Sequence, residues 1–197
     1  TLVLFGGASF AAFPLFYSTS FGGAYWVWLI ILFCFIVQAV SYEYRKKEGN
    51  FLGSRTYEVF LLINGILGVF LIGVALSTFF SGANFRLDSS NFVEWENASK
   101  GLEALLNPWN FLLGFALVFL SRVLACGYFL NNIDDEIIKE RVKRKIALNS
   151  VVFLVFFLGF LFWIFTKEGF FVSQDGLVSM QKFLYFQNFL EMPFLIA

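Results

Sequence analysis

The stretch Gly6–Lys47, GGASFAAFPLFYSTSFGGAYWVWLIILFCFIVQAVSYEYRKK, decides the fold class of this chain. Two apolar segments, 2–17 and 24–41, flank a short turn around a Gly-Gly pair, and a block of basic residues stops the second one. As a helix, segment 24–41 would be about 27 Å long. That length is close to the hydrocarbon thickness of a bilayer, about 30 Å. The stretch therefore predicts a helical hairpin inside a membrane.

The rest of the chain repeats this pattern of apolar segments and polar loops. Of its 197 residues, 59% are hydrophobic and only 14% are charged, whereas soluble domains carry about 25% charged residues. The apolar runs are continuous and do not alternate as in a barrel. We predict an all-α, polytopic integral membrane helical bundle forming one transmembrane domain. The predicted spans are 2–17, 24–41, 57–80, 108–130 and 146–165, with the start of a sixth at 188–197.

The connecting segments carry weaker signals. We expect 81–107 to be a polar loop with a short amphipathic segment at 98–106, and 166–186 to be an aromatic-rich loop at the membrane surface. Asn107 and Pro108 suit the N-cap and first turn of the next span. Because the chain starts with Thr1 inside an apolar run and ends inside another, we expect a piece of a longer membrane protein.

Basic residues predict the orientation of the spans. The loops after the second and fourth spans hold nine lysines and arginines, and the loops on the other side hold four. By the positive-inside rule, the richer loops are cytoplasmic. A formal net charge of zero gives no indication of nucleic acid binding. The nine are Arg45, Lys46, Lys47, Arg55, Lys139, Arg141, Lys143, Arg144 and Lys145.

Small residues inside the spans predict close helix packing. Gly6, Gly7 and Ala11 give the first span a small-residue face, and Pro14 is expected to kink it. A second pair, Gly73 and Ser77, has the same four-residue spacing in the third span. Small side chains let helix backbones approach closely where lipid supplies no hydrophobic drive.

A few polar and ionisable residues lie inside the spans or at their ends. For Gln38 the favoured interpretation is an interhelical hydrogen bond, and Glu43 has Lys47 four residues later as an ion-pair partner. Arg122 lies well inside its span, which by default suggests a functional role. The chain has no histidine, so it offers no His-ligated haem, His metal site or His general base. Its two cysteines, Cys34 and Cys126, are interpreted as apolar packing residues.

Three motifs resemble one known family. They are GGASFAAFPLFY followed by FGGAYW, then SYEYRKK at the end of the second span, and LLNPWN at 105–110. Together they resemble subunit II of the cytochrome bd quinol oxidases, and the resemblance extends in order along the chain. Two features differ: the family's upstream Trp-Asp-Gly-Asn-Glu segment is missing, and Gln38 stands where an arginine is expected.

The resemblance implies a subunit of a quinol:oxygen oxidoreductase in the bacterial inner membrane, oxidising quinol and reducing dioxygen to water. It implies that haem b and haem d belong to a partner, subunit I, which carries the electron-transfer chemistry. This chain would pack against that partner amid membrane lipid, assist cytoplasmic proton access and bind a structural quinone.

The resemblance also assigns roles to residues. It places Glu43 at an acidic position for proton entry, and Gln38, Ser41 and Arg45 share a neighbouring helical stripe. Arg122 is a candidate to replace the positive charge missing at Gln38. Two alternatives remain open: half of a secondary transporter, whose spans are also interrupted by Gly and Pro, and a purely structural scaffold subunit.

Overall fold

The computed structural model describes residues 7–8, 10–14, 17–18, 24–82, 84–90, 92–173 and 176–192. Within these residues, long helices dominate and two short hairpins connect them. In chain order the elements are α3 (Tyr25–Tyr44), α4 (Ser54–Ser81), β1 (Phe85–Leu87), β2 (Val93–Trp95), the 3-10 helix η1 (Leu102–Leu105), α5 (Pro108–Asn132), α6 (Glu136–Thr166), β3 (Gly169–Val172), β4 (Val178–Gln181) and α7 (Leu184–Glu191).

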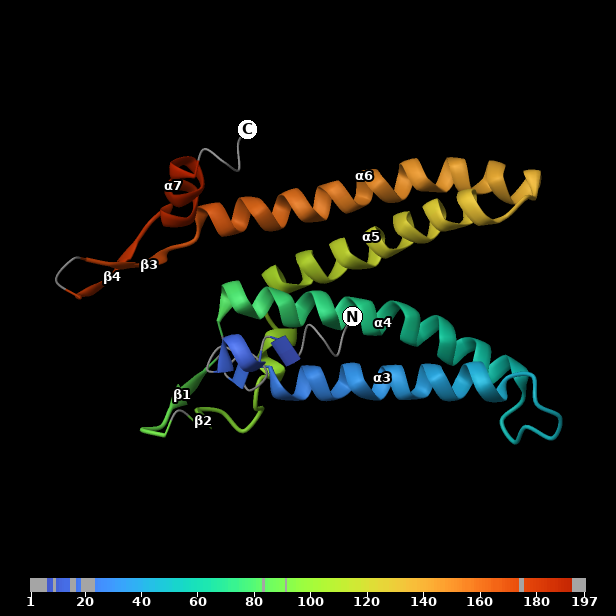
Figure 1. Ribbon diagram of the computed structural model, residues 1–197, viewed down its shortest axis with the longest axis horizontal. Coiled ribbons are helices and arrows are strands. Elements are labelled where there is room, and N and C mark those ends of the chain that lie inside the picture. The colour runs from blue at the N-terminus through green and yellow to red at the C-terminus, as the bar shows by residue number, and fades with distance from the viewer. Residues whose placement is uncertain are drawn as a thin grey trace.

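Four of the helices form an antiparallel row. Helix α4 packs against α3 and α5, and α5 packs against α6. The α3–α4 and α5–α6 turns lie at one end of the row, and both β-hairpins lie at the other (Figure 1). In the described part of the chain, these four are the helices long and apolar enough to cross a membrane. The nine basic residues counted above lie in the α3–α4 turn, at the start of α4 and in the first turns of α6, so this end is called the basic end and the other the hairpin end.

The predicted spans 24–41, 57–80, 108–130 and 146–165 each overlap one of these helices. Helix α6 is longer than its span because it starts at Glu136, ten residues earlier. Asp135 caps this start, since its side-chain oxygen accepts a hydrogen bond from the Ile138 amide at 2.9 Å. The charged segment before Ile146 is therefore one continuous helix with the apolar part.

The two predicted loops contain more regular structure than expected, although the short segment predicted at 98–106 does contain η1. Segment 81–107 contains the antiparallel β1–β2 hairpin and η1, and segment 166–186 contains the β3–β4 hairpin. The strands are rich in aromatic and β-branched residues, which favour extended structure around tight turns. These strands are only three or four residues long, so the chain keeps its all-α class.

The C-terminal end also differs from the prediction of a sixth span starting at 188. Helix α7 begins at Leu184 and ends at Glu191. The residue before a proline is disfavoured in a helix, and Met192 precedes Pro193, which explains this end. Eight residues extend about 12 Å, too short to cross a bilayer. Residues 193–197 lie outside the described residues, so that part of the span stays a prediction.

Half of the predicted first span, Gly6 included, lies outside the described residues. Gly7, Ala11 and Pro14 are described and are exposed. A Cβ atom built on Gly7 would meet nothing within 4 Å. The packing role of this Gly/Ala face therefore has no partner among the described helices and stays a prediction.

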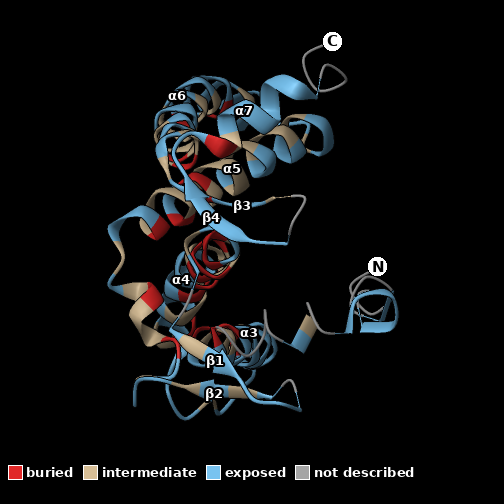
Figure 2. Ribbon diagram, turned by 90° about the vertical axis from the view of Figure 1, so that its left-hand side faces the viewer, coloured by how far each residue is buried: buried red, intermediate tan, exposed pale blue. Residues whose placement is uncertain are grey.

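The buried residues of the row lie between neighbouring helices. On α3 and α4 they include Val27, Ile31 and Val74, each at most 4% exposed. Figure 2 shows the buried positions facing between the helices, while the outer faces are exposed. Those outer faces are strongly apolar, with Leu62 65% and Phe162 69% exposed. Exposed apolar surface on this scale indicates contact with lipid or other protein.

Two contacts define how α5 sits in the row. On its α4 side, Gly73 and Gly114 bring the two backbones together, which confirms that Gly73 favours close packing. On its α6 side, the rings of Trp109 and Trp163 stack with centroids 5.7 Å apart and planes 8° apart. Both tryptophans lie at the hairpin end, where such rings mark a membrane surface.

Candidate functional sites at the two ends of the helix row

The basic end of α3 holds the residues that the sequence singled out for proton access. Glu43 is exposed, and its Oε1 lies 2.7 Å from Nζ of Lys47. This hydrogen bond raises the pKa of Lys47, because the carboxylate stabilises the ammonium form. The predicted ion pair is therefore present, and Glu43 points away from the core of the row.

Ser41 lies on the opposite side of the helix and is only 1% exposed. Its hydroxyl donates to the carbonyl of Val37 at 2.7 Å, so the backbone of α3 itself satisfies it. Gln38 is half-buried, and the described residues offer its side chain no hydrogen bond. The favoured interhelical bond of Gln38 is thus missing from the described part of the chain.

Arg45 closes the turn between α3 and α4. Its carbonyl accepts hydrogen bonds from the Ser54 hydroxyl at 2.9 Å and the Asn50 amide at 3.3 Å. Its guanidinium carbon lies 5.7 Å from the centre of the Tyr42 ring. The four proton-pathway candidates therefore lie near one another along α3 but do not converge on one site.

Arg122 lies on α5, where it lines a groove against α6. Helix α4 stands between α5 and α3 in the row (Figure 1). The geometry therefore does not support the hypothesis that Arg122 replaces the charge missing at Gln38. Its neighbours across the groove are the cations Arg141 and Lys145.

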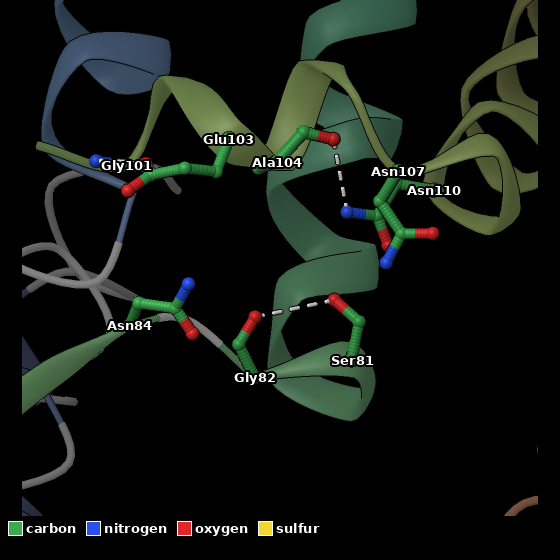
Figure 3. Close-up of a pocket in the computed structure, with 8 residues that line it drawn as sticks. All are labelled: Ser81, Gly82, Asn84, Gly101, Glu103, Ala104, Asn107 and Asn110. Atoms are coloured by element: carbon green, nitrogen blue, oxygen red, sulfur yellow. Dashed lines mark hydrogen bonds between the residues drawn. The ribbon is translucent and has the colours of Figure 1, made fainter. Parts of the chain in front are cut away.

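A polar pocket of about 340 Å³ lies at the hairpin end, between the end of α4 and the start of α5 (Figure 3). A buried hydrogen-bond chain supports its wall. The Ser77 hydroxyl donates to Oδ1 of Asn110 at 2.8 Å, and Nδ2 of Asn110 donates to the Ala104 carbonyl at 3.0 Å. This chain ties α4, α5 and η1 together. The lining residues are Ser81, Gly82, Asn84, Gly101, Glu103, Ala104, Asn107 and Asn110.

Glu103 is the acidic group of this pocket. Its Oε2 accepts from the Gly101 amide at 2.8 Å, and its Oε1 is buried without a hydrogen-bond partner among the described residues. Burial raises the pKa of this carboxyl, but neighbouring backbone amides and the Ser99 and Asn97 side chains stabilise its charged form. The net pKa is below the ordinary value of 4.5. The pocket therefore holds a carboxylate that stays ionised at neutral pH.

Sequence reasoning missed this pocket. Asn110 is part of the LLNPWN motif, and Glu103 lies in the predicted amphipathic segment, but neither has a spacing that indicates a shared site. The sequence also missed Lys167, whose ammonium donates to the carbonyl of Phe80 and lies 5.5 Å from the Trp163 ring. Burial lowers the pKa of Lys167. These residues meet only because the helix ends come together in the fold.

Comparison with known proteins identifies the family. The family model for cytochrome bd terminal oxidase subunit II matches residues 1–197. The chain belongs to this family. The prediction made from the three sequence motifs is thereby confirmed.

Individual members of this family show the same relationship. The chain is 27% identical to "Probable cytochrome oxidase subunit 2" of Haemophilus influenzae, over 98% of this chain and 53% of that protein. It is 25% identical to "Cytochrome bd-I ubiquinol oxidase subunit 2" of Escherichia coli K12, over 79% of this chain and 40% of that protein. It is 30% identical to "Cytochrome bd ubiquinol oxidase subunit 2" of Bacillus subtilis, over 42% of this chain and 24% of that protein. The chain thus spans about half the length of the first of these relatives, and less of the others.

Proposed function

We propose that this chain is a non-haem part of subunit II in a bd-type terminal oxidase, which oxidises quinol and reduces dioxygen to water. The observation that carries the proposal is the family match across residues 1–197. Four helices that can cross a membrane support a multi-pass protein, and we place it in the bacterial inner membrane with its basic end in the cytoplasm. The match to an oxidase family favours this reading over half of a secondary transporter.

We infer that the residues of this chain do not ligate a haem. Haem iron takes its axial ligands chiefly from His, Cys, Met or Tyr side chains, and the chain has no histidine. Cys34 is buried against α4, where its Cβ approaches Gly68. Met180 and Met192 are exposed outside the four long helices. We therefore propose that haem b and haem d lie in a partner subunit I, and that electron transfer takes place there and not in this chain.

The open row of helices supports packing against such a partner. Helix α5 lies between α4 and α6. Even so, only 11% of the residues in its most apolar stretch of 18 residues are buried inside the chain. The remaining apolar surface needs cover from lipid or from a second subunit, because exposing it to water is unfavourable. A structural quinone would find an apolar groove of about 480 Å³ on α3, lined by Tyr25, Trp28, Leu29, Ile31, Leu32 and Phe35.

We further propose that Glu43 collects protons at the cytoplasmic mouth of the complex. Its exposure on the face of α3 away from α4 supports this role, because a group there can exchange protons with water. Ser41 is buried, Gln38 is half-buried, and Arg45 closes the turn between α3 and α4. We assign these three residues a structural role at the end of α3, next to Glu43.

Replacing Glu43 by Gln in the complete oxidase is expected to lower quinol-driven oxygen uptake by on the order of tenfold or more, because the amide cannot bind and release a proton. The measurement is oxygen consumption by purified complex of unchanged haem content. Glu48→Gln is the matched control, since Glu48 is a nearby exposed acid and should leave the rate unchanged.

Lys47→Gln separates proton transfer from ion pairing. It removes the partner of Glu43 but leaves the carboxylate in place. If Lys47→Gln slows oxygen uptake as much as Glu43→Gln, the ion pair is structural and the scaffold interpretation is correct. Unchanged uptake in Glu43→Gln would contradict the proton role directly.

A further inference from the structure

The groove between α5 and α6 at the basic end has a cationic rim. It measures about 330 Å³, and Arg122, Arg141 and Lys145 line it from both helices. The described residues include no carboxylate within ion-pair distance of these three cations, and no acid lines the groove. Next to the α5–α6 turn, by contrast, a lysine does have an acidic partner: Lys139 at the start of α6 pairs with Asp134 at 2.8 Å. Arg144 extends the same basic surface beside the groove.

The floor of the groove is apolar apart from one amide. Ala125, Cys126, Phe129 and Val142 form this apolar part. Asn149 completes it, is only 4% exposed, and makes no side-chain hydrogen bond to a described residue. Because this amide lines the groove and has no partner among the described residues, it is available to hydrogen-bond an occupant of the groove.

The depth of the cations in the membrane suggests what that occupant is. The stacked tryptophans, Trp109 and Trp163, mark the membrane surface at the hairpin end. Measured along the helices from that surface, Arg122 lies about 20 Å away, Lys145 about 27 Å and Arg141 about 33 Å. The hydrocarbon core is about 30 Å thick, so the three cations bracket its opposite boundary. The long side chain of Arg122 can extend toward that boundary.

From these observations we propose that the α5–α6 groove binds the head group of an anionic phospholipid. The phosphodiester accepts hydrogen bonds from the guanidinium groups of Arg122 and Arg141 and from the ammonium of Lys145. The Asn149 amide donates to a head-group or ester oxygen, and an acyl chain follows the apolar floor. Basic pockets between membrane helices are suited to such head groups, and three unpaired cations give the charge complementarity that a zwitterionic lipid lacks.

This site goes beyond the oxidase assignment, and it does not depend on a proton role for Glu43. The bound lipid would hold α5 and α6 together, because its negative charge offsets the repulsion between Arg122 on α5 and the cations Arg141 and Lys145 on α6. The alternative occupant is a carboxylate-bearing helix of another subunit, and the experiment below separates the two.

The test uses the complete purified complex, stripped of loosely bound lipid and incubated with equal amounts of phosphatidylglycerol and phosphatidylcholine. Native mass spectrometry counts the retained lipids. The wild-type complex is expected to retain about tenfold more phosphatidylglycerol than phosphatidylcholine, or a still larger excess. Each cation near a membrane contributes about 1 kcal/mol, so removing one lowers the preference about fivefold. Arg122→Gln combined with Lys145→Gln is expected to abolish most of it.

Lys143→Gln is the matched control, because Lys143 lies on α6 but does not line the groove. Arg122→Lys combined with Arg141→Lys keeps the charge and should keep most of the preference. If the Gln double variant does not assemble, the wild-type preference must still fall at high ionic strength. Equal retention of the two lipids by the wild type, a preference insensitive to salt, or an equal loss in Lys143→Gln would overturn the proposal.

Discussion

Replacing Gly73 by Ala is expected to destabilise the protein by about 1–3 kcal/mol, the usual effect of overpacking a tight contact. A Cβ at Gly73 would lie 2.6 Å from Cα of Gly114 and 2.7 Å from the carbonyl oxygen of Leu113. Both atoms belong to the backbone of α5, so no side-chain rotation can relieve the clash. Helices α4 and α5 must separate instead, and Gly73→Leu should prevent assembly. The measurement is the yield and thermal unfolding midpoint of the detergent-purified complex.

Gly65→Ala on the same helix is the matched control. A Cβ at Gly65 would meet nothing within 4 Å, and alanine is a better helix former than glycine. This variant should therefore be as stable as the wild type or slightly more so. Equal loss of stability in Gly65→Ala and Gly73→Ala would show that the α4–α5 contact is not as close as described.

Replacing Asn110 by Ala is expected to destabilise the protein by about 2–4 kcal/mol. Asn110 is 1% exposed, and its amide accepts from Ser77 and donates to the Ala104 carbonyl. Its removal leaves a buried hydroxyl and a buried carbonyl without partners, and each such group costs about 1–3 kcal/mol. The hairpin-end pocket should loosen as α4, α5 and η1 lose their common link. Thermal unfolding of the purified complex measures the effect.

Two further variants test this interpretation of Asn110. Ser77→Ala breaks only one of the two bonds and should cost less than Asn110→Ala. Asn132 lies at the other end of α5, where its exposed side-chain amide donates to the Tyr128 carbonyl of the same helix, so Asn132→Ala should change stability little. If Asn110→Ala is no more destabilising than Asn132→Ala, the buried hydrogen-bond chain does not hold the helices together.

The long helices could be predicted from the sequence because membrane hydrophobicity is a local property. Runs of about twenty apolar residues identify spans without knowledge of their neighbours. The small residues Gly73 and Ser77 likewise indicated a packing face. Their partners on α5, Gly114 and Asn110, could not be predicted, because spacing along one helix does not reveal which helix faces it.

The candidate sites were harder to predict from the sequence, because most of them are formed by residues of different helices. The Glu43–Lys47 pair was predictable because both residues lie one turn apart on one helix. The groove of Arg122, Arg141 and Lys145 forms across two antiparallel helices, and the sequence alone suggested a different role for Arg122. The hairpins were missed because their strands of three or four residues carry too short an alternation to recognise.

The central claim is that this chain is a non-haem part of a bd-type oxidase, and a reduced-minus-oxidised visible spectrum tests it most directly. The complete subunit carrying this chain is tagged and purified from membranes, once with its partner subunit present and once without it. The account predicts b- and d-type haem signals only in the preparation that contains the partner. Absence of both signals from the complex, or their presence in the subunit purified alone, would contradict the account.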